Sequence, residues 1–176
     1  MEGAFRVIGE VTNHTPFTQE ITRVSGAFYD QAGQVIASDD DVTDHWPQDL
    51  VPPGGQAPFD LSVGRIQNAA SFHLFVEAAD ITTNVRQDFV LTALQQFTEA
   101  NSYCVRGVLQ NPGQRLQEAL VIVAVLYDSQ KQVVNYGDFS QRPPANIAGN
   151  STLSFKICVA PPNQNIAEYS IQAWGR

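Results

Sequence analysis

The chain consists of short runs in which apolar residues recur at every second position. Residues 5–11 show this alternation, and residues 103–109 repeat it in the same phase. A period of two is typical of a β-strand with one face packed against a core. Residues 119–126 are instead apolar throughout, which predicts a central strand or one that a neighbouring domain covers. Because no segment combines a helical period with caps at both ends, the pattern predicts an all-β protein.

The second half of the sequence is a copy of the first. Without a gap, 32 residues align at an offset of 98, and nine of these positions are identical. Gly9 falls on Gly107 in this alignment. Three pairs of segments match along the chain, namely 5–36 with 103–134, 51–63 with 147–159, and 72–76 with 169–173. Because such a repeat indicates repeated structural units, we expect two tandem β-sandwich domains, residues 1–83 and 84–176.

One predicted strand of the second domain has no counterpart in the first. Residues 87–94 form a strand candidate ahead of the strand at Tyr103, whereas only four residues precede Phe5. A sheet without this strand presents unpaired backbone N–H and C=O groups at its edge. We expect Met1 to be an artificial start within a longer protein, and the alternative is that another chain supplies the strand. Residues 80–86 are the predicted linker.

The two copies share a Tyr-Asp step at the end of their second predicted strand. A turn follows, then Gln-Val-Ile or Gln-Val-Val, and then a turn with Pro or Gly ahead of a strand with Phe. In this order the chain resembles the FxLYD domain, an immunoglobulin-like β-sandwich module of bacteria and archaea, through Tyr29, Asp30, Tyr127 and Asp128. Gly26 and Ala124 replace the first Phe of the family motif. The resemblance implies two tandem immunoglobulin-like antiparallel β-sandwiches of an extracytoplasmic protein, without catalytic residues.

The residues around the first Tyr-Asp step predict a tight turn. Asp30 is expected to accept hydrogen bonds from the backbone N–H groups that follow it, in a three-residue loop with a bulge. Gly33 is expected at positive φ. Lys131 takes this position in the second copy, where a left-handed backbone would cost about 1 kcal/mol. Both tyrosines are expected at the rim of a core, with a buried ring and a bonded hydroxyl.

Acidic residues are concentrated in one predicted loop of the first copy. Residues 39–49 contain five carboxylates, a density typical of Ca²⁺ sites, and Asp39, Asp41 and Asp44 are the candidate ligands. Their spacing differs from the calcium-loop motif, so we favour a solvated acidic loop. Trp46 lies in the same loop and is the candidate contact residue, because Trp often anchors a protein partner.

Both cysteines lie in the second copy. By strand alternation, Cys104 and Cys158 are out of phase with the core residues and point outward. Two outward cysteines form a disulfide only where their strands are neighbours. Closing a loop of 158 − 104 = 54 residues would then stabilise the domain by about 4 kcal/mol in the chain-entropy model. The sequence leaves two interpretations, a disulfide and two separate thiols.

Charge excludes some classes of partner. The net charge of −8 argues against a nucleic-acid binder, which needs a basic face. Residues 1–85 contain 12 acidic and 3 basic residues, so a cationic partner should prefer the first copy. Apolar runs stay shorter than the roughly 18 residues that span a bilayer, so we expect no membrane contact within this chain.

The sequence contains no catalytic or cofactor motif. The three histidines have no second His or Cys at the spacing of a metal site, and both a nucleophile elbow and a phosphate loop are missing. We expect a non-catalytic, cofactor-free extracytoplasmic module that serves as a spacer or protein-interaction domain of a larger surface or secreted protein. The alternatives are self-assembly through the open edge and Ca-dependent carbohydrate binding. The expected partners are accordingly another protein, a second copy of the chain or a surface polymer.

Overall fold

The computed structural model describes residues 5–64, 66–83, 85–141, 147–160 and 165–176. The fold is all-β, and every strand pair is antiparallel among the described residues. One 3₁₀ turn, η1 (Asp39–Asp41), is the only helical segment in these ranges. The chain divides into two compact units, the first unit (Met1–Thr83) and the second unit (Asn84–Arg176).

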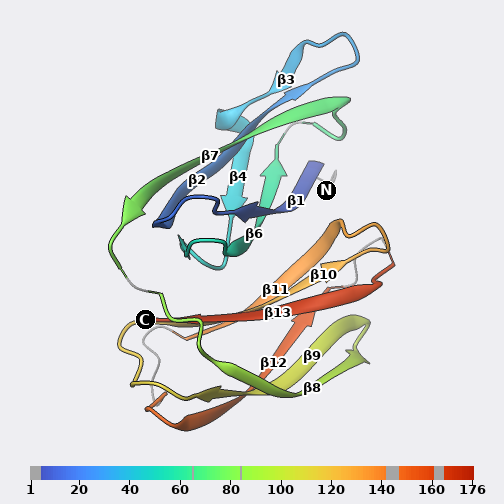
Figure 1. Ribbon diagram of the computed structural model, residues 1–176. Coiled ribbons are helices and arrows are strands. Elements are labelled where there is room, and N and C mark those ends of the chain that lie inside the picture. The colour runs from blue at the N-terminus through green and yellow to red at the C-terminus, as the bar shows by residue number, and fades with distance from the viewer. Residues whose placement is uncertain (1–4, 65, 84, 142–146, 161–164) are drawn as a thin grey trace. The chain divides into compact units, whose positions relative to one another are not determined.

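The first unit contains two antiparallel sheets (Figure 1). Its strands are β1 (Phe5–Thr12), β2 (Thr18–Tyr29), β3 (Val35–Ala37), β4 (Val42–His45), β5 (Leu50–Val51), β6 (Gln56–Val63) and β7 (Ser71–Ile81). One sheet has the order β1-β6-β4. In the other, β2 pairs with β7 along one side and with β3 and β5 on its other side. Both sheets contribute to one buried cluster, which includes Phe28 of β2 and Leu61 of β6.

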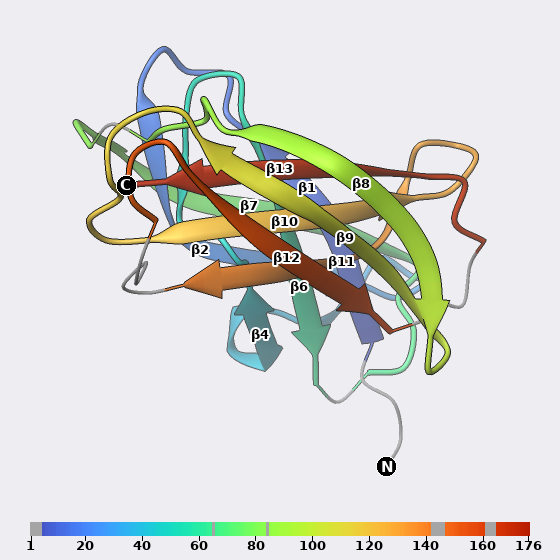
Figure 2. The same cartoon turned by 90° about the horizontal axis from the view of Figure 1, so that it is seen from below.

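The second unit contains two antiparallel sheets of three strands. Its strands are β8 (Val90–Glu99), β9 (Ser102–Asn111), β10 (Leu120–Tyr127), β11 (Val133–Gln141), β12 (Ser151–Val159) and β13 (Glu168–Gly175). One sheet has the order β12-β9-β8, and these strands lie side by side in Figure 2. The other has the order β11-β10-β13. Both sheets again share one buried cluster, which includes Leu126 of β10 and Phe155 of β12.

The central strand β10 is buried on both faces. Leu120 and Ile122 point into the cluster shared by the two sheets. Val121 and Val123 belong to a second buried cluster on the other face, together with Trp174 of β13. The prediction that residues 119–126 form a central strand is therefore confirmed.

A Gly-Phe pair between neighbouring strands repeats in the two units. Gly9 of β1 lies opposite Phe59 of β6, and Gly107 of β9 lies opposite Phe155 of β12. A Cβ atom on either glycine would lie 2.9 Å from the Cζ atom of the facing ring. Glycine is required at both positions because each Phe ring lies against the backbone, which explains why these pairs are identical in the two copies.

The two units differ in the segment after the Tyr-Asp turn. In the second unit this segment is the continuous strand β11, which pairs with β10. In the first unit it is divided, because β3 pairs with β2 and, after η1, β4 pairs with β6 of the other sheet. The acidic residues of η1 therefore lie where the chain passes from one sheet to the other.

Strand bounds near the junction of the units differ from the sequence prediction. β7 extends to Ile81, and the Arg86 N–H already donates to the Gly175 carbonyl of β13 at 2.9 Å, so the connection is shorter than residues 80–86. β8 also begins and ends later than the predicted range 87–94. Ala100 and Asn101, at φ 47° and 64°, form the tight turn that joins β8 to β9.

Candidate functional site

The first unit has an unpaired sheet edge at β1. Among the described residues, β1 pairs only with β6, whereas its counterpart β9 pairs with both β12 and β8. The Asn13 N–H donates to the Gly55 carbonyl at 3.0 Å. By the alternation of an antiparallel ladder, the backbone groups of Val11 then face β6, and those of Ile8 face the open edge.

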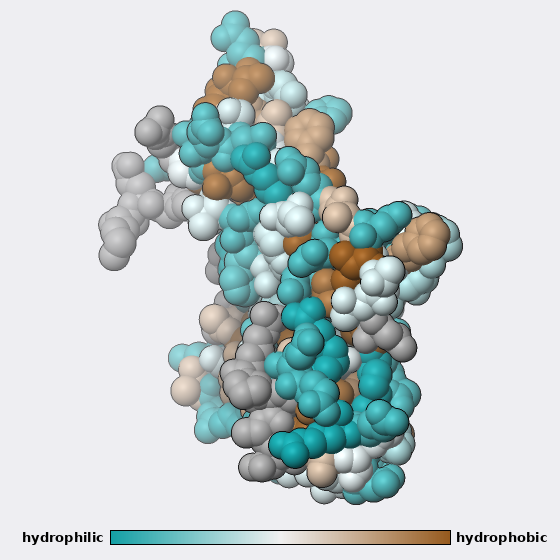
Figure 3. Space-filling view, turned by 90° about the vertical axis from the view of Figure 1, so that its left-hand side faces the viewer, coloured by the Kyte–Doolittle hydropathy of each residue, from teal (hydrophilic) through white to brown (hydrophobic). Residues whose placement is uncertain are grey.

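An apolar groove of about 370 Å³ lies beside this edge, between β1 and β7. Ile21 and Val51, which are buried, line it together with half-buried Val11 and exposed Val76 and Ala78. Apolar patches among polar side chains are also visible on the face of the molecule shown in Figure 3. A concave apolar opening with a few polar groups is typical of a binding site.

Strand β8 occupies the equivalent position in the second unit. Leu91 of β8 lies opposite Leu109, the counterpart of Val11, and packs against the core. The Cζ atom of Phe89 lies 2.7 Å from where a Cβ atom on Gly175, the counterpart of Ala78, would stand. The groove of the first unit therefore corresponds to the place that Leu91 of β8 and Phe89, directly before β8, fill in the second unit.

The burial of matching residues differs accordingly. Leu109 is fully buried, whereas its counterpart Val11 is half-buried. Ala173 is 8% exposed, whereas its counterpart Val76 is 43% exposed. The first unit thus exposes apolar side chains at positions that are covered in the second unit. Exposed apolar surface of this kind commonly marks an interaction site.

The first unit carries an excess of negative charge. Its 12 acidic residues outnumber its 3 basic ones, and Arg6 is already engaged with Asp60 at 2.5 Å. Asp80, near the end of β7, accepts a hydrogen bond from Gln19, which lines the groove. The electrostatic field around the groove therefore favours a cationic partner.

The two Asp residues of the Tyr-Asp steps close turns. Asp30 Oδ1 accepts hydrogen bonds from two backbone N–H groups of its own turn, at 2.8 and 2.9 Å. Asp128 Oδ1 accepts the same two bonds at the same distances. Gly33 has a φ of 77° and Lys131 a φ of 64°. The predicted turn is confirmed in both units, and both carboxylates are used within it.

The two Tyr residues of these steps lie half-buried at the ends of β2 and β10. The Tyr127 hydroxyl oxygen is 3.2 Å from the Ser170 Oγ atom, as expected for a rim aromatic with a bonded hydroxyl. The Tyr29 ring packs edge to face with His73 at a centroid distance of 5.9 Å. Both tyrosines thus have partners inside their own units.

The three calcium candidates do not converge. Asp44 Oδ2 accepts a hydrogen bond from a backbone N–H of β2 at 3.0 Å. Asp39 instead faces Arg23 at 3.8 Å, and Asp41 Oδ2 accepts a hydrogen bond from the Ser38 N–H at 3.3 Å. These carboxylates therefore hold the segment that passes between the two sheets.

The two tryptophans pack within their own units. Trp46, the candidate contact residue, is half-buried and packs against the core of the first unit. Trp174 is buried in the second cluster of the second unit. Both rings contribute to packing, so the apolar surface available to a partner is that of the groove and of exposed residues such as Phe75 on β7.

The two cysteines form a disulfide. They are direct partners on β9 and β12, with Cα atoms 4.1 Å apart. Neither cysteine belongs to a core cluster, as predicted from strand phase, but only Cys158 is exposed, because Cys104 is buried next to Phe97 of β8. Across the described ranges, Glu99 and the two cysteines are the only three potential metal ligands whose ligand atoms lie within 4.8 Å of one another. The disulfide removes both thiolates from that group.

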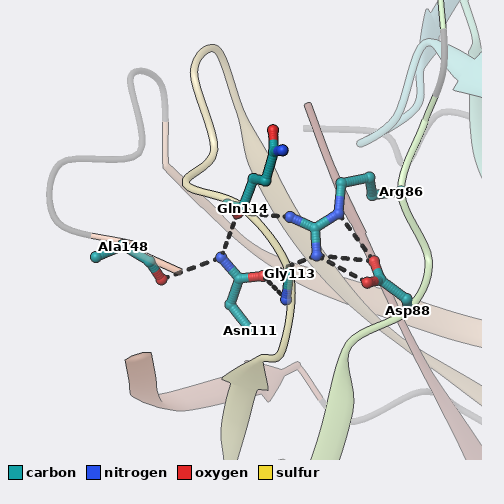
Figure 4. A network of polar contacts seen from close by, with 6 residues as sticks. All are labelled: Arg86, Asp88, Asn111, Gly113, Gln114 and Ala148. Carbon is teal, nitrogen blue, oxygen red and sulfur yellow. Dashed lines mark hydrogen bonds and ion pairs between the residues drawn. The ribbon is translucent and has the colours of Figure 1, made fainter. Parts of the chain in front are cut away.

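A buried amide joins the loops at one end of the second unit (Figure 4). Asn111 Nδ2 donates to the carbonyls of Gln114 and Ala148 at 2.8 and 3.1 Å. Its Oδ1 accepts from the Gly113 N–H at 3.2 Å and from Arg86 Nη2 at 2.8 Å. The side chain is fully buried, and all of its hydrogen-bonding capacity is used.

Asn13 has the same role in the first unit. Its Nδ2 donates to the carbonyls of Phe17 and Val51 at 2.7 and 2.8 Å, and its Oδ1 accepts from the N–H and hydroxyl of Thr15. Sequence reasoning assigned no role to this Asn or to its copy. The available signal was an identical Asn directly before a turn in both copies.

The Arg86 guanidinium also binds Asp88, with Nε and Nη2 each 2.9 Å from a carboxylate oxygen. This hydrogen bond holds the pKa of Asp88 below its ordinary value of 3.8. Tyr103 shifts in the other direction, because burial raises the pKa of its hydroxyl, and the nearby Tyr169 adds to the effect. Both groups belong to the second unit.

The described part of the chain contains no helix with the length and apolar character needed to cross a bilayer. Comparison with known proteins finds no family model that matches the sequence and no curated protein that is similar to it.

Proposed function

We propose that the chain is a non-catalytic module of a larger extracytoplasmic protein, in which two immunoglobulin-like antiparallel β-sandwiches serve as a spacer or protein-interaction domain. Two compact units, each with two antiparallel sheets around a shared core, support this architecture. The turns closed by Asp30 and Asp128 are consistent with the proposed FxLYD assignment.

The observation that carries the proposal is the engagement of polar side chains inside the fold. Asp30 and Asp128 close turns, Asp44 binds the backbone of β2, and Asn111 joins loops. Catalysis instead requires polar groups directed at a substrate. The free feature of the first unit is an apolar groove beside an open strand edge, which is a surface suited to binding a polypeptide.

The disulfide supports a location outside the cytoplasm. Disulfides persist in secreted and surface proteins, whereas cytosolic thiols are kept reduced. The Cys104–Cys158 bond closes a loop with a sequence separation of 54. Its stabilisation of about 4 kcal/mol would be lost in a reducing compartment.

Self-assembly through the open edge is the second candidate function. It is favoured by the unpaired edge of β1. It is opposed by charge, because two first units, each with 12 acidic and 3 basic residues, repel each other. Light scattering coupled to size exclusion distinguishes the two candidates, since self-assembly predicts a concentration-dependent mass and a module for another partner predicts a monomer.

Photo-crosslinking of the full chain in its native host tests the interaction role. A crosslinker at Val76, which is exposed on β7 and lines the groove, should capture a partner protein, whereas one at Val35, which is exposed on β3, is the matched control. Capture from both positions would indicate nonspecific contact, and capture from neither would leave only the spacer role.

Two further measurements test the remaining parts of the proposal. Thiol alkylation before and after reduction should label cysteine only after reduction, and free thiols in the native protein would contradict the extracytoplasmic location. A panel of ester, glycoside, peptide and phosphate substrates should give no turnover. Turnover that is abolished by substitutions in this chain would overturn the non-catalytic role.

A further inference from the structure

We infer that the groove of the first unit binds an extended, basic segment of another polypeptide, which adds a strand antiparallel to β1. The inference rests on the proposed function and specifies the chemistry of the partner. The segment presents an aromatic residue and, two positions later, an aliphatic residue, both directed into the groove, with lysine or arginine beside them.

The second unit provides the template for the side chains. β8 runs antiparallel to β9, and Phe89, directly before β8, lines the same pocket of the second unit as Leu91, two positions later. Through the internal repeat, the position of Leu91 corresponds to a site opposite Val11. The position of Phe89 corresponds to a site over Ala78. Val11 and Ala78 both line the groove of the first unit.

A third apolar position follows after a bulge. The register of β8 shifts between Thr92 and Gln95, and Ala93 has a φ of 52°. Beyond this bulge, the Cδ2 atom of Leu94 lies 2.7 Å from where a Cβ atom on Gly107 would stand. Gly9 is the counterpart of Gly107, so it leaves the same space on the first unit. The expected pattern of the bound segment is therefore Phe-x-Leu-x-x-Leu.

The backbone of β1 supplies the other half of the site. The N–H and C=O groups of Ile8 face the open edge, which is the direction from which an added strand forms a ladder. Backbone pairing provides affinity in such complexes, and the pockets for alternate side chains provide specificity.

Charge argues for a different polypeptide rather than a second copy. The first unit has 12 acidic and 3 basic residues, so an identical unit approaching the same edge is repelled. A basic segment is attracted, and Asp80 near the end of β7, which accepts a hydrogen bond from the groove residue Gln19, places a carboxylate beside the groove. The affinity of such a segment should therefore decrease as the salt concentration increases.

A synthetic peptide tests the inference on the full chain. The probe has the sequence of residues 87–98 with Asp88→Lys and carries a fluorophore for anisotropy. Saturable binding is expected, and raising the salt should weaken it. A control peptide with Phe89→Ser and Leu91→Ser should bind about tenfold more weakly or worse, since it loses the buried apolar side chains.

Variants of the chain locate the site. Val76→Lys places a charge in the groove at an exposed position and should weaken binding about tenfold or more. Val35→Lys changes another exposed valine, on β3, adds the same charge away from the groove and should leave the affinity within about twofold. Ile8→Pro removes an N–H from the open edge without removing a bond to β6 and should also abolish binding. If Ile8→Pro fails to fold, the affinity of Val76→Lys for the peptide tests the location of the site instead.

Hydrogen exchange identifies the strand that is covered. The bound peptide should protect the amides of residues 8–12 of the first unit. Protection of β9 instead would mean that the peptide replaces β8, and it would overturn the inference. Three further results would also overturn it: no saturable binding up to about 1 mM, equal binding by Val76→Lys, and a dimer that the peptide fails to dissociate. A partner that crosslinks to the chain outside the groove would contradict this inference but not the proposed function. Enzymatic turnover would contradict the proposed function but not this inference.

Discussion

Replacing the buried Asn of each unit by Asp tests the role of these amides with an almost isosteric change. In Asn13→Asp, a carboxylate oxygen takes the place of the Nδ2 group that donates to two carbonyls at 2.7 and 2.8 Å. In Asn111→Asp, the same change affects two carbonyls at 2.8 and 3.1 Å. Because the volume is unchanged, any loss of stability comes from hydrogen bonding and charge.

The expected cost follows from counting the bonds. Each variant leaves two carbonyls unsatisfied at about 1–3 kcal/mol apiece, so the cost is roughly 2–6 kcal/mol. Asn111→Asp regains about 1 kcal/mol of this, because its other oxygen lies 2.8 Å from Arg86 Nη2 and that bond becomes charge-assisted. The oxygen of Asn13 accepts only from Thr15. We therefore expect Asn13→Asp to be the more destabilising variant.

The two units can be followed separately because each contains one tryptophan, Trp46 or Trp174. Urea unfolding of Trp46→Phe and Trp174→Phe backgrounds then reports on one unit at a time. Asn13→Asp should lower the midpoint of the first unit by about 1 M urea or more and leave the second unit unchanged. The cost should shrink as the pH falls, because burial raises the folded-state pKa of the introduced carboxyl above its unfolded value, and its protonated form is the one compatible with burial.

Two outcomes would refute this reasoning. A cost below about 0.5 kcal/mol in both units would mean that the carbonyls find other donors, such as water, once the amide is gone. A larger cost for Asn111→Asp than for Asn13→Asp would mean that the Arg86 guanidinium does not compensate the introduced charge.

Three further predictions concern the second unit. The double variant Cys104→Ser/Cys158→Ser should lose about 4 kcal/mol of stability in a thermal melt, with the first unit unaffected. Lys131→Gly should stabilise its turn by about 0.5–1 kcal/mol because φ is 64° there, and Gly33→Lys, at φ 77°, should destabilise the first unit by a similar amount. Asp88→Asn should cost well under 1 kcal/mol, because the carboxylate is half exposed. Its lowered folded-state pKa means that this stabilisation is full above pH about 4 and lost as the pH falls further, so acid titration should bring the two proteins together.

Much of the strand pattern could be predicted because period and repetition are local properties of the sequence. Residues 119–126 lie in a strand buried on both faces, and Asp30 and Asp128 close the same turn. A turn at residues 98–101 could be predicted and is found at Ala100 and Asn101, but the strand before it extends to Glu99 rather than to residue 94. The burial of Cys104 also escaped prediction, since it depends on the neighbouring strand rather than on strand phase.

For the groove, the sequence could predict only that a strand next to β1 is missing, and not the groove itself. The sequence indicated that the first copy lacks the strand found at residues 87–94 of the second. It did not indicate which side chains this leaves uncovered, because that depends on how β1 and β7 approach each other. The structure identifies them as residues such as Val11 and Val76, whose counterparts in the second unit are covered.

The way in which the two copies diverged bears on the role of the groove. On the outer face of the second unit, Val121 and Trp174 are cross-strand partners and are buried. Their counterparts in the first unit are the cross-strand partners Arg23 and Glu77, which are charged and exposed at 43% and 65% of their side-chain surface. At this cross-strand pair, apolar residues of the second unit thus correspond to charged residues in the first, whereas Phe75 on the same face of β7 is apolar and 53% exposed. Val76, next to Glu77 on β7, is 43% exposed and is also apolar. An apolar residue at this exposed position of the groove is consistent with a partner that covers the groove.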